Sequence, residues 1–192
     1  VDNAFYTSED VASRIWRLLS DAGFTGGRVL DLGCGHGRFA LACPDGVDID
    51  YHGVEIDPTA AQIAQLANPR ARIVGERLQD VTLPTGGFDL VVGNVPFGEF
   101  SVTDPTHNAM RHSIHNHFII KSLRLTAPGG YVAVMTSTYT MDSQRATARR
   151  EMARYGDLVG AVRLPNGAVR YFTVRESCRI QTFPDDYRLH GA

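Results

Sequence analysis

The sequence is poor in cysteine, almost without lysine, and free of long hydrophobic runs. Its three cysteines are scattered along the chain, so we expect neither a disulfide framework nor a zinc site, and a reducing, cytoplasmic location is the default expectation. No apolar stretch approaches the roughly 20 residues of a membrane-spanning helix, so no membrane partner is expected. The N-terminal residues show no basic segment followed by an apolar one, so we expect no signal peptide.

The basic residues are almost all arginine: the chain has 18 arginines, and Lys121 is the only lysine. The net charge of −2 conceals an asymmetry, since residues 1–104 carry a net charge of −8 and residues 105–192 a net charge of +6. A basic half indicates a nucleic-acid partner. Charge alone leaves a second interpretation open, in which the arginines lie on solvated helix faces.

The chain of 192 residues, 43% of them hydrophobic, suffices for one globular domain. Short apolar runs predict buried strands at 28–32, 51–56, 72–74, 88–93, 131–135 and 158–164. Segments with helical periodicity lie between them, at 7–21, 38–43, 58–67, 113–125 and 143–155. This alternation predicts an α/β fold, a Rossmann-like, doubly wound sheet with helices on both faces.

A glycine-rich turn follows the first predicted strand, in the order Asp31-Leu-Gly33-Cys-Gly35-His-Gly37. Glycines let the backbone turn sharply and approach a ligand, but this spacing differs from the G-x-G-x-x-G of dinucleotide binders. A carboxylate just before the turn suits a cationic ligand such as S-adenosylmethionine better than a phosphate. Glu55, at the end of the second strand, is placed to accept ribose hydroxyls, and Asp80, after the third, to accept from an adenine amine. A flavodoxin-like or dehydrogenase turn is the alternative.

Together these residues resemble motifs I, II and III of class I S-adenosylmethionine-dependent methyltransferases. The stretch Asp31–Gly37 matches the first motif, Glu55 the second and Asp80 the third. Tyr6 and Thr7 resemble the motif that precedes the first helix in many amino-methyltransferases and packs on the methionine moiety. An ordinary helix start with a capping threonine is the alternative for these two residues.

The tetrapeptide Asn94-Val95-Pro96-Phe97 follows the fourth strand and resembles the (Asn/Asp/Ser)-Pro-Pro-(Tyr/Phe) motif of methyltransferases that act on planar amines. The resemblance implies that the Asn94 side-chain oxygen and the Val95 carbonyl accept the two N–H groups of the amine and aim its lone pair at the methyl group. Pro96 would stiffen the loop and Phe97 would stack on the target base. Valine replaces the first proline of the motif, which leaves the carbonyl in place.

With the segments 112–119, 128–142 and 149–165, these motifs look like the N6-adenine DNA methylase domains of phages and mobile elements. The resemblance implies direct in-line transfer to a flipped adenine in DNA, with S-adenosylmethionine as cofactor. It further implies a prokaryotic or phage origin and a recognition or helicase-like partner protein. The alternatives are an N4-cytosine or RNA adenine methyltransferase, or a S-adenosylmethionine-binding accessory module that works only with a partner.

Four of the seven histidines, at positions 107, 112, 115 and 117, lie close together in the sequence. Their spacing fits no familiar ligand pattern, so we expect no metal. We expect these side chains instead to line the catalytic cleft or to contact phosphate.

We expect a methyltransferase domain over residues 1–167 and a short tail over 168–192, with no further strand after Pro165. The tail resembles motif IX of cytosine-5 DNA methyltransferases, and Thr173 and Glu176 form a capping box that predicts a helix to about residue 181. A cytosine-5 mechanism is disfavoured, because the chain lacks the Pro-Cys pair of those enzymes.

Overall fold

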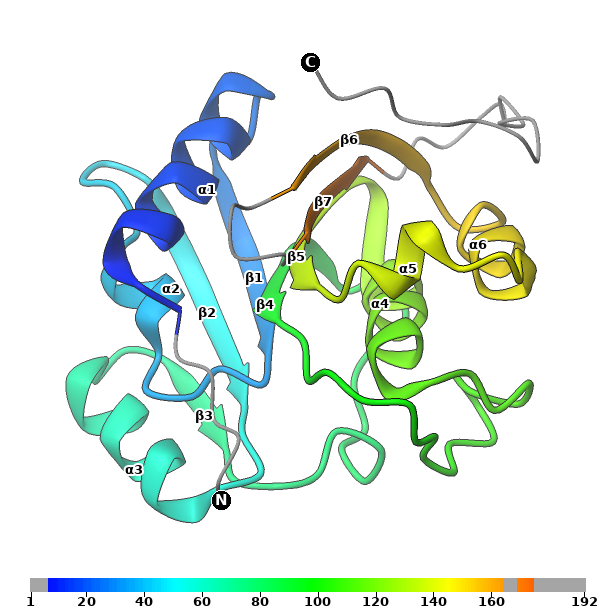
Figure 1. Ribbon diagram of the computed structural model, residues 1–192. Coiled ribbons are helices and arrows are strands. Elements are labelled where there is room, and N and C mark those ends of the chain that lie inside the picture. Colours follow the sequence, from blue (N-terminus) through cyan, green and yellow to red (C-terminus); the bar gives the residue numbers. More distant parts are fainter. Residues whose placement is uncertain (1–6, 164–168, 175–192) are drawn as a thin grey trace.

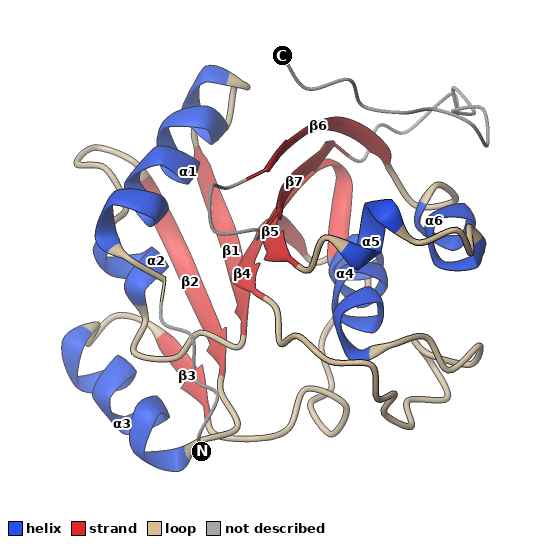
Figure 2. Ribbon diagram, viewed as in Figure 1, coloured by secondary structure: helices blue, strands red, loops and turns tan. Residues whose placement is uncertain are grey.

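The computed structural model describes residues 7–163 and 169–174, which form a seven-stranded sheet with helices on both faces (Figure 1, Figure 2). The strands are β1 (Gly26–Leu32), β2 (Asp48–Val54), β3 (Arg72–Val74), β4 (Phe88–Asn94), β5 (Thr126–Thr136), β6 (Asp157–Arg163) and β7 (Val169–Val174). The helices are α1 (Glu9–Asp21), α2 (Arg38–Leu41), α3 (Pro58–Ala67), α4 (Ile114–Leu125), α5 (Tyr139–Asp142) and α6 (Thr147–Met152). The predicted α/β, doubly wound architecture is confirmed.

The order of the strands creates a site at one edge of the sheet. The order is β3-β2-β1-β4-β5-β7-β6; β1 to β5 run parallel, and β7 lies antiparallel between β5 and β6. The chain winds outward from β1 to β3 and then outward again from β4, so the direction of winding reverses between β1 and β4. Loops leaving the carboxyl ends of these two strands part from each other, and such a crevice is where open α/β sheets bind ligands.

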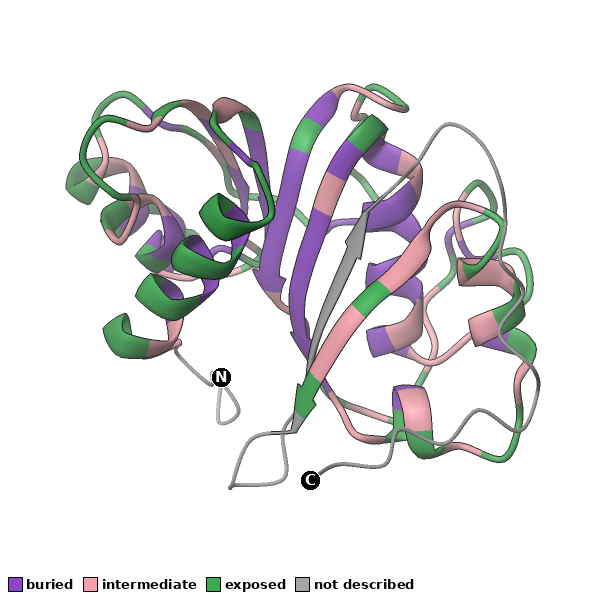
Figure 3. Ribbon diagram, turned by 90° about the horizontal axis from the view of Figure 1, so that it is seen from above, coloured by how far each residue is buried: buried purple, intermediate pink, exposed green. Residues whose placement is uncertain are grey.

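Both faces of the central strands are buried, because consecutive side chains point to opposite sides of a sheet. One core cluster joins α1 to one face and contains Trp16, Val29, Leu90, Val92 and Ala133. The other joins α4 to the opposite face and contains Leu30, Val91, Leu123, Val132 and Val134. Figure 3 shows this burial along the central strands, with exposed residues on the outer faces of the helices.

Helix α1 supports the segment that follows the glycine turn. Ser8 caps the helix by accepting a hydrogen bond from the Val11 amide at 3.4 Å. Trp16 is fully buried, and its indole N–H donates to the Phe39 carbonyl of α2 at 2.8 Å. With 13 residues α1 is the longest helix in the described ranges, and none of the helices there is long and apolar enough to cross a membrane.

The predicted helix over 143–155 is present but shorter, because α6 covers only Thr147–Met152 and a break separates it from the preceding short helix α5. Ser143 adopts an extended conformation with ψ of 131° immediately after α5. The guanidinium of Arg149 donates to the Ser143 carbonyl at 2.8 Å and to the Thr140 carbonyl at 3.2 Å. A side chain of α6 therefore satisfies the carbonyl groups that a continuous helix would have used.

The expectation that no strand follows Pro165 is also wrong. β7 pairs with β5 from Val174 opposite Tyr131 to Val169 opposite Thr136, and with β6 on its other side. The sheet therefore continues beyond residue 167, and Thr173, predicted to cap a helix, lies within this strand. The rest of the predicted tail helix and its resemblance to motif IX fall in 175–192, outside the described residues.

We predict that Trp16→Ala lowers the free energy of unfolding by about 3–5 kcal/mol, because it removes a fully buried ring and leaves the Phe39 carbonyl without its donor. Urea denaturation measures this loss. Leu18→Ala on the same helix is the control, because that side chain is 42% exposed and its loss costs less than about 1 kcal/mol. Equal losses in the two variants would contradict the packing described here.

Candidate functional site

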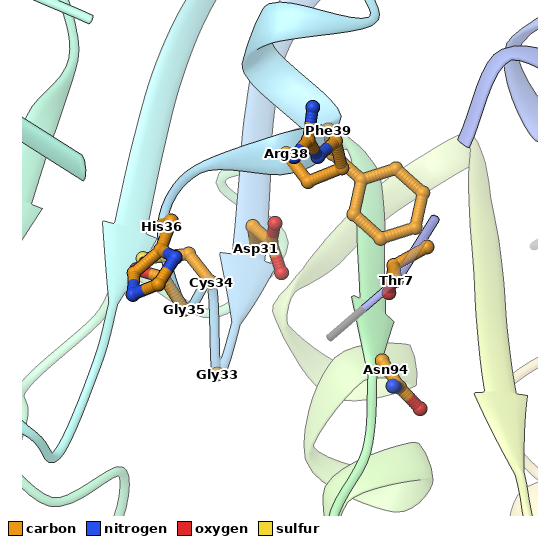
Figure 4. A pocket seen from close by; sticks show the side chains of 9 residues that line it. All are labelled: Thr7, Asp31, Gly33, Cys34, Gly35, His36, Arg38, Phe39 and Asn94. Carbon is orange, nitrogen blue, oxygen red and sulfur yellow. The ribbon is translucent and has the colours of Figure 1, made fainter. Parts of the chain in front are cut away.

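The glycine turn and the end of β4 enclose a cavity of about 280 Å³ at the β1–β4 crevice. Its lining comes from the segment before α1, from β1, the turn and α2, and from β4 (Figure 4): Thr7, Asp31, Gly33, Cys34, Gly35, His36, Arg38, Phe39 and Asn94. Ligand pockets commonly have volumes of about 300–1,000 Å³, so this cavity lies near the small end of the range. The structure thus brings together Thr7, Asp31, Gly33, Gly35 and Asn94 from the residues predicted from sequence.

Asp31 is the most unusual group in this cavity. Its side chain is 1% exposed, and its Oδ2 accepts a hydrogen bond from the Tyr51 hydroxyl at 2.6 Å. Oδ1 is buried and has no hydrogen-bond partner among the residues that the structure describes. Burial raises the pKa of the Asp31 carboxyl to about 7, while the Tyr51 hydrogen bond lowers it and the charge of Glu55 raises it further.

A buried carboxylate with one unused oxygen suits a cationic ligand. Burying a polar atom without a hydrogen-bond partner costs free energy. An ammonium group placed against Oδ1 would donate the missing hydrogen bond and favour the ionised carboxylate. S-adenosylmethionine, the cofactor implied by the sequence motifs, carries such an ammonium group. The residues of the cavity therefore fit this cofactor.

Glu55 stands directly after β2 and braces the glycine turn. Its Oε2 accepts from the Gly35 amide at 2.8 Å, and its Oε1 accepts from the Asp57 amide at 2.9 Å. Each carboxylate oxygen keeps a second lone pair that can accept a ribose hydroxyl. Glu55 does not line the cavity itself and reaches it through Gly35.

The turn ends at Gly37, where no other residue fits well. Gly37 has a φ of 74° and precedes α2, and this left-handed conformation disfavours residues with a Cβ. A Cβ here would also lie 2.5 Å from the Nδ2 atom of Asn68. The glycine thus allows the turn to pack closely against the end of α3 and its cap.

The predicted catalytic tetrapeptide leaves the sheet beside Asp31. Asn94 is the last residue of β4 and lines the cavity, while Val95 is buried and donates its amide hydrogen to the Met135 carbonyl at 3.0 Å. Pro96 and Phe97 are exposed. The hydrogen bond ties Val95 to β5, and the next two residues are exposed to solvent.

Helix α4 holds the chain just after the tetrapeptide. His115 is buried, and burial lowers the pKa of its imidazole, so the ring is neutral. Its Nδ1–H donates to the Gly98 carbonyl at 3.1 Å, and its Nε2 accepts from the Ser113 hydroxyl at 3.0 Å. The Ile114 amide donates to the Phe100 carbonyl at 2.8 Å. These contacts fasten the loop to the start of α4.

The other histidines of the 107–117 segment form hydrogen bonds or ion pairs within the protein and do not form a phosphate-binding surface. Asp104 accepts from His117 at 3.1 Å and from Lys121 at 3.1 Å, and the Lys121 ammonium also donates to the Leu78 carbonyl at 2.6 Å. Burial raises the pKa of Asp104, but hydrogen bonds from the His107 amide, Lys121 and His117 outweigh this and hold it well below its usual value. No cluster able to hold a metal is found within the described part of the chain.

Asp80, like Glu55, does not line the cavity. It is exposed in the turn after β3, where its amide donates to the Arg77 carbonyl at 2.9 Å. Tyr6 lies outside the described residues. Sequence reasoning missed Tyr51, whose hydroxyl contacts Asp31, and the lining residue Phe39. Phe39 could have been inferred from its place two residues after the turn, but nothing in the sequence marks Tyr51.

The comparisons with known proteins agree with this site. The family model described as "Methyltransferase domain" matches residues 5–180. Over 171 residues the chain is 29% identical to Defense against restriction protein B of Escherichia phage P1. This match covers 85% of this chain and 7% of that protein. It is 28% identical over 148 residues to rRNA N(6)-adenosine-methyltransferase metl-5 of Caenorhabditis elegans, covering 72% of this chain and 65% of that one.

A further relative is Type II methyltransferase M.TthHB8I of Thermus thermophilus, 30% identical over 151 residues that cover 68% of this chain and 34% of that protein. The chain thus spans less than two thirds of each of these three relatives. Among solved structures, it resembles a protein of Listeria monocytogenes described as a class I S-adenosylmethionine-dependent methyltransferase. The TM-score is 0.74 at 15% identity, covering 97% of this chain and 66% of that one.

The raised pKa of Asp31 predicts a pH-dependent affinity for S-adenosylmethionine. A bound ammonium group favours the carboxylate, so binding below pH 7 must release the proton that Asp31 holds in the free protein. We expect the affinity to fall by up to about tenfold between pH 7 and pH 6. Isothermal titration calorimetry measures both the affinity and the released proton.

Asp31→Asn should bind more weakly and lose this pH dependence, because an amide does not titrate in this range. Asp48→Asn is the matched control and should keep the pH dependence, because Asp48 is exposed at the start of β2. The same pH dependence in Asp31→Asn and in the unchanged protein would show that another group is responsible.

Proposed function

The chain belongs to the methyltransferase-domain family, and from this premise we propose that it methylates the exocyclic N6 amine of adenine in DNA. Its cofactor is S-adenosylmethionine. The observation that carries the proposal is the place of Asn94, at the end of β4, on the cavity that also contains the Asp31 carboxylate. This arrangement brings the binding site of a cationic cofactor and the binding site of an amine together at one edge of the sheet.

Five residues of the first half are assigned to the cofactor. Asp31 would bind the ammonium group, and Gly33 and Gly35 would let the backbone approach it closely. Glu55 would accept the ribose hydroxyls while it holds the Gly35 amide. Thr7, on the wall formed by the segment before α1, would close the cavity over the methionine moiety. When bound, S-adenosylmethionine supplies an electrophilic methyl group.

The tetrapeptide is assigned to the acceptor amine. The nitrogen of an exocyclic amine is a poor nucleophile, because its lone pair is delocalised into the ring. The Asn94 side-chain oxygen and the Val95 carbonyl would accept its two N–H groups and hold the lone pair in one direction. Since the Val95 amide is fixed to the Met135 carbonyl, the sheet itself orients the carbonyl that follows. This is catalysis by positioning.

Phe97 would bind the face of the target base. Its side chain is 39% exposed, next to the cavity wall formed by Asn94. Stacking of a base on an aromatic ring is worth about 1–3 kcal/mol. A base inside a duplex cannot reach this loop, so the target nucleotide would have to leave the stack or come from a single strand.

An RNA adenine is the second candidate acceptor. It is favoured by the similarity to metl-5, an rRNA N(6)-adenosine-methyltransferase, over 72% of this chain. The tetrapeptide binds the amine in the same way in both cases, so the surfaces around the loop would decide between the two nucleic acids. A recognition or helicase-like partner protein is part of the proposal, as the resemblance to phage and mobile-element methylases implies.

Incubation of the chain with methyl-labelled S-adenosylmethionine and mixed-sequence DNA or RNA, followed by nucleoside analysis, tests this proposal. Labelled N6-methyldeoxyadenosine supports DNA adenine as the acceptor, and labelled N6-methyladenosine in RNA alone supports the second candidate. Label in N4-methylcytosine, or cofactor binding without transfer to either nucleic acid, would contradict the proposal.

We predict that Asn94→Ala lowers kcat by at least about 100-fold, because it removes one of the two acceptors of the amine. The affinity for S-adenosylmethionine should change little, as measured by calorimetry. Asn94→Asp is the matched control, since it keeps an accepting oxygen at the same position and should retain measurable transfer. Equal transfer by Asn94→Ala and the unchanged protein would contradict the role of Asn94 as an acceptor of the amine.

A further inference from the structure

The loop between the tetrapeptide and α4 contains an unusual backbone conformation at Arg111. Its φ is 53°, and it is the one non-glycine residue with a positive φ within 7–163 and 169–174. In this left-handed region the Cβ crowds the neighbouring carbonyl oxygen, so glycine and asparagine are the usual occupants. A local outlier of this kind requires surroundings that enforce it, and it often marks a functional position.

The buried side chain of Asn108 enforces this conformation. Its Oδ1 accepts from the His112 amide at 2.8 Å, and its Nδ2 donates to the His112 carbonyl at 3.2 Å and to the Val102 carbonyl at 3.0 Å. The Arg111 amide donates to the Asn108 carbonyl at 2.9 Å. Asn108 therefore brackets Arg111 from both sides and closes a tight turn around it.

Contacts on both sides of Arg111 anchor this turn to helices α4 and α6. The Asn108 amide donates to the Asp104 carbonyl at 2.7 Å, and the Asp104 carboxylate binds Lys121 of α4. On the other side of Arg111, His112 is joined to Glu151 of α6 at 2.7 Å. The position of Arg111 is thus fixed before any ligand arrives, which lowers the entropy cost of a contact made there.

The side chain of Arg111 itself is directed to solvent. It is exposed and has no carboxylate partner among the described residues. Several other arginines are used within the protein: Arg14 pairs with Asp10, Arg38 with Glu9, and Arg149 binds two carbonyl groups. Arg111 therefore has a fixed backbone position and an exposed guanidinium whose donors face solvent.

The same loop exposes apolar side chains beside this cation. Phe100 is 60% exposed and Met110 is 57% exposed, and Phe97 lies at the start of the segment. The Ile114 amide binds the Phe100 carbonyl, so Phe100 is held close to the same end of α4 that follows Arg111. Figure 1 shows this loop running from the end of β4 to the start of α4. Aromatic groups with a cation are the usual surface for a single nucleic-acid strand.

We propose that Arg111 binds a backbone phosphate of the nucleic-acid strand that carries the target base. The inference rests on the proposed nucleic-acid acceptor and adds the residue that positions the strand next to the tetrapeptide. Its guanidinium offers paired N–H donors that match phosphate oxygens.

The test is binding of a fluorescein-labelled, mixed-sequence single-stranded DNA, followed by fluorescence anisotropy at several salt concentrations. In Arg111→Gly we expect the Kd to rise about fivefold and the slope of log K against log salt to fall by about one. The thermal midpoint should stay the same or rise by up to about 3 °C, since glycine relieves the backbone conformation. Weaker binding without a lower thermal midpoint separates a binding role from a structural one, because loss of a structural contact would lower the midpoint as well.

Arg111→Lys keeps the charge and should keep the salt slope, whereas Arg70→Gly, an exposed arginine after α3, should change neither quantity. An unchanged Kd and slope in Arg111→Gly would overturn the inference, as would a protein that binds no nucleic acid at all. If the unchanged protein binds DNA but transfers no methyl group, the proposed function fails. The role of Arg111 in binding is then still decided by the salt slope.

Discussion

The contact between Glu55 and the Gly35 amide holds the candidate site together. It ties the turn after β1 to the end of β2, and the second Glu55 oxygen ties it to the Asp57 amide just before α3. With the turn fixed, Asp31 remains buried below it with an unused oxygen, and Asn94 lies across the cavity on the neighbouring strand β4. The cavity thus depends on one carboxylate that bridges two parallel strands.

A second anchored unit completes the acceptor side of the site. The loop after the tetrapeptide is long and polar, but Asp104 of the loop binds Lys121 of α4, and His115 of α4 binds the Gly98 carbonyl of the loop. Because the buried Asp104–Lys121 pair is satisfied by further hydrogen bonds, the network serves to define one loop conformation. The exposed parts of the loop, Phe97 and Arg111, are then presented from a rigid base.

Local patterns in the sequence predicted most of what positions this site. Apolar runs and the glycine turn gave the central strands and the place of Asp31, since parallel strands buried on both faces have distinctive composition. Contacts between residues far apart in the sequence could not be predicted from these local patterns. The hydroxyl of Tyr51 meets Asp31 only because β1 and β2 pair, and β7 lies between β5 and β6, which precede it in the sequence. The histidines of this segment were expected to line the catalytic cleft or to contact phosphate, and the pairing of His117 with Asp104 and of His112 with Glu151 became visible only in three dimensions.

The central claim is that one edge of the sheet binds both the cofactor and the amine that receives the methyl group. A crystal structure of the chain with S-adenosylhomocysteine and a single-stranded, adenine-containing oligonucleotide tests it most directly. We expect the ammonium group of the cofactor product against Asp31 Oδ1 and an adenine amine within hydrogen-bond distance of Asn94. A base bound away from Asn94, or a cofactor product outside the cavity at Asp31, would contradict the account.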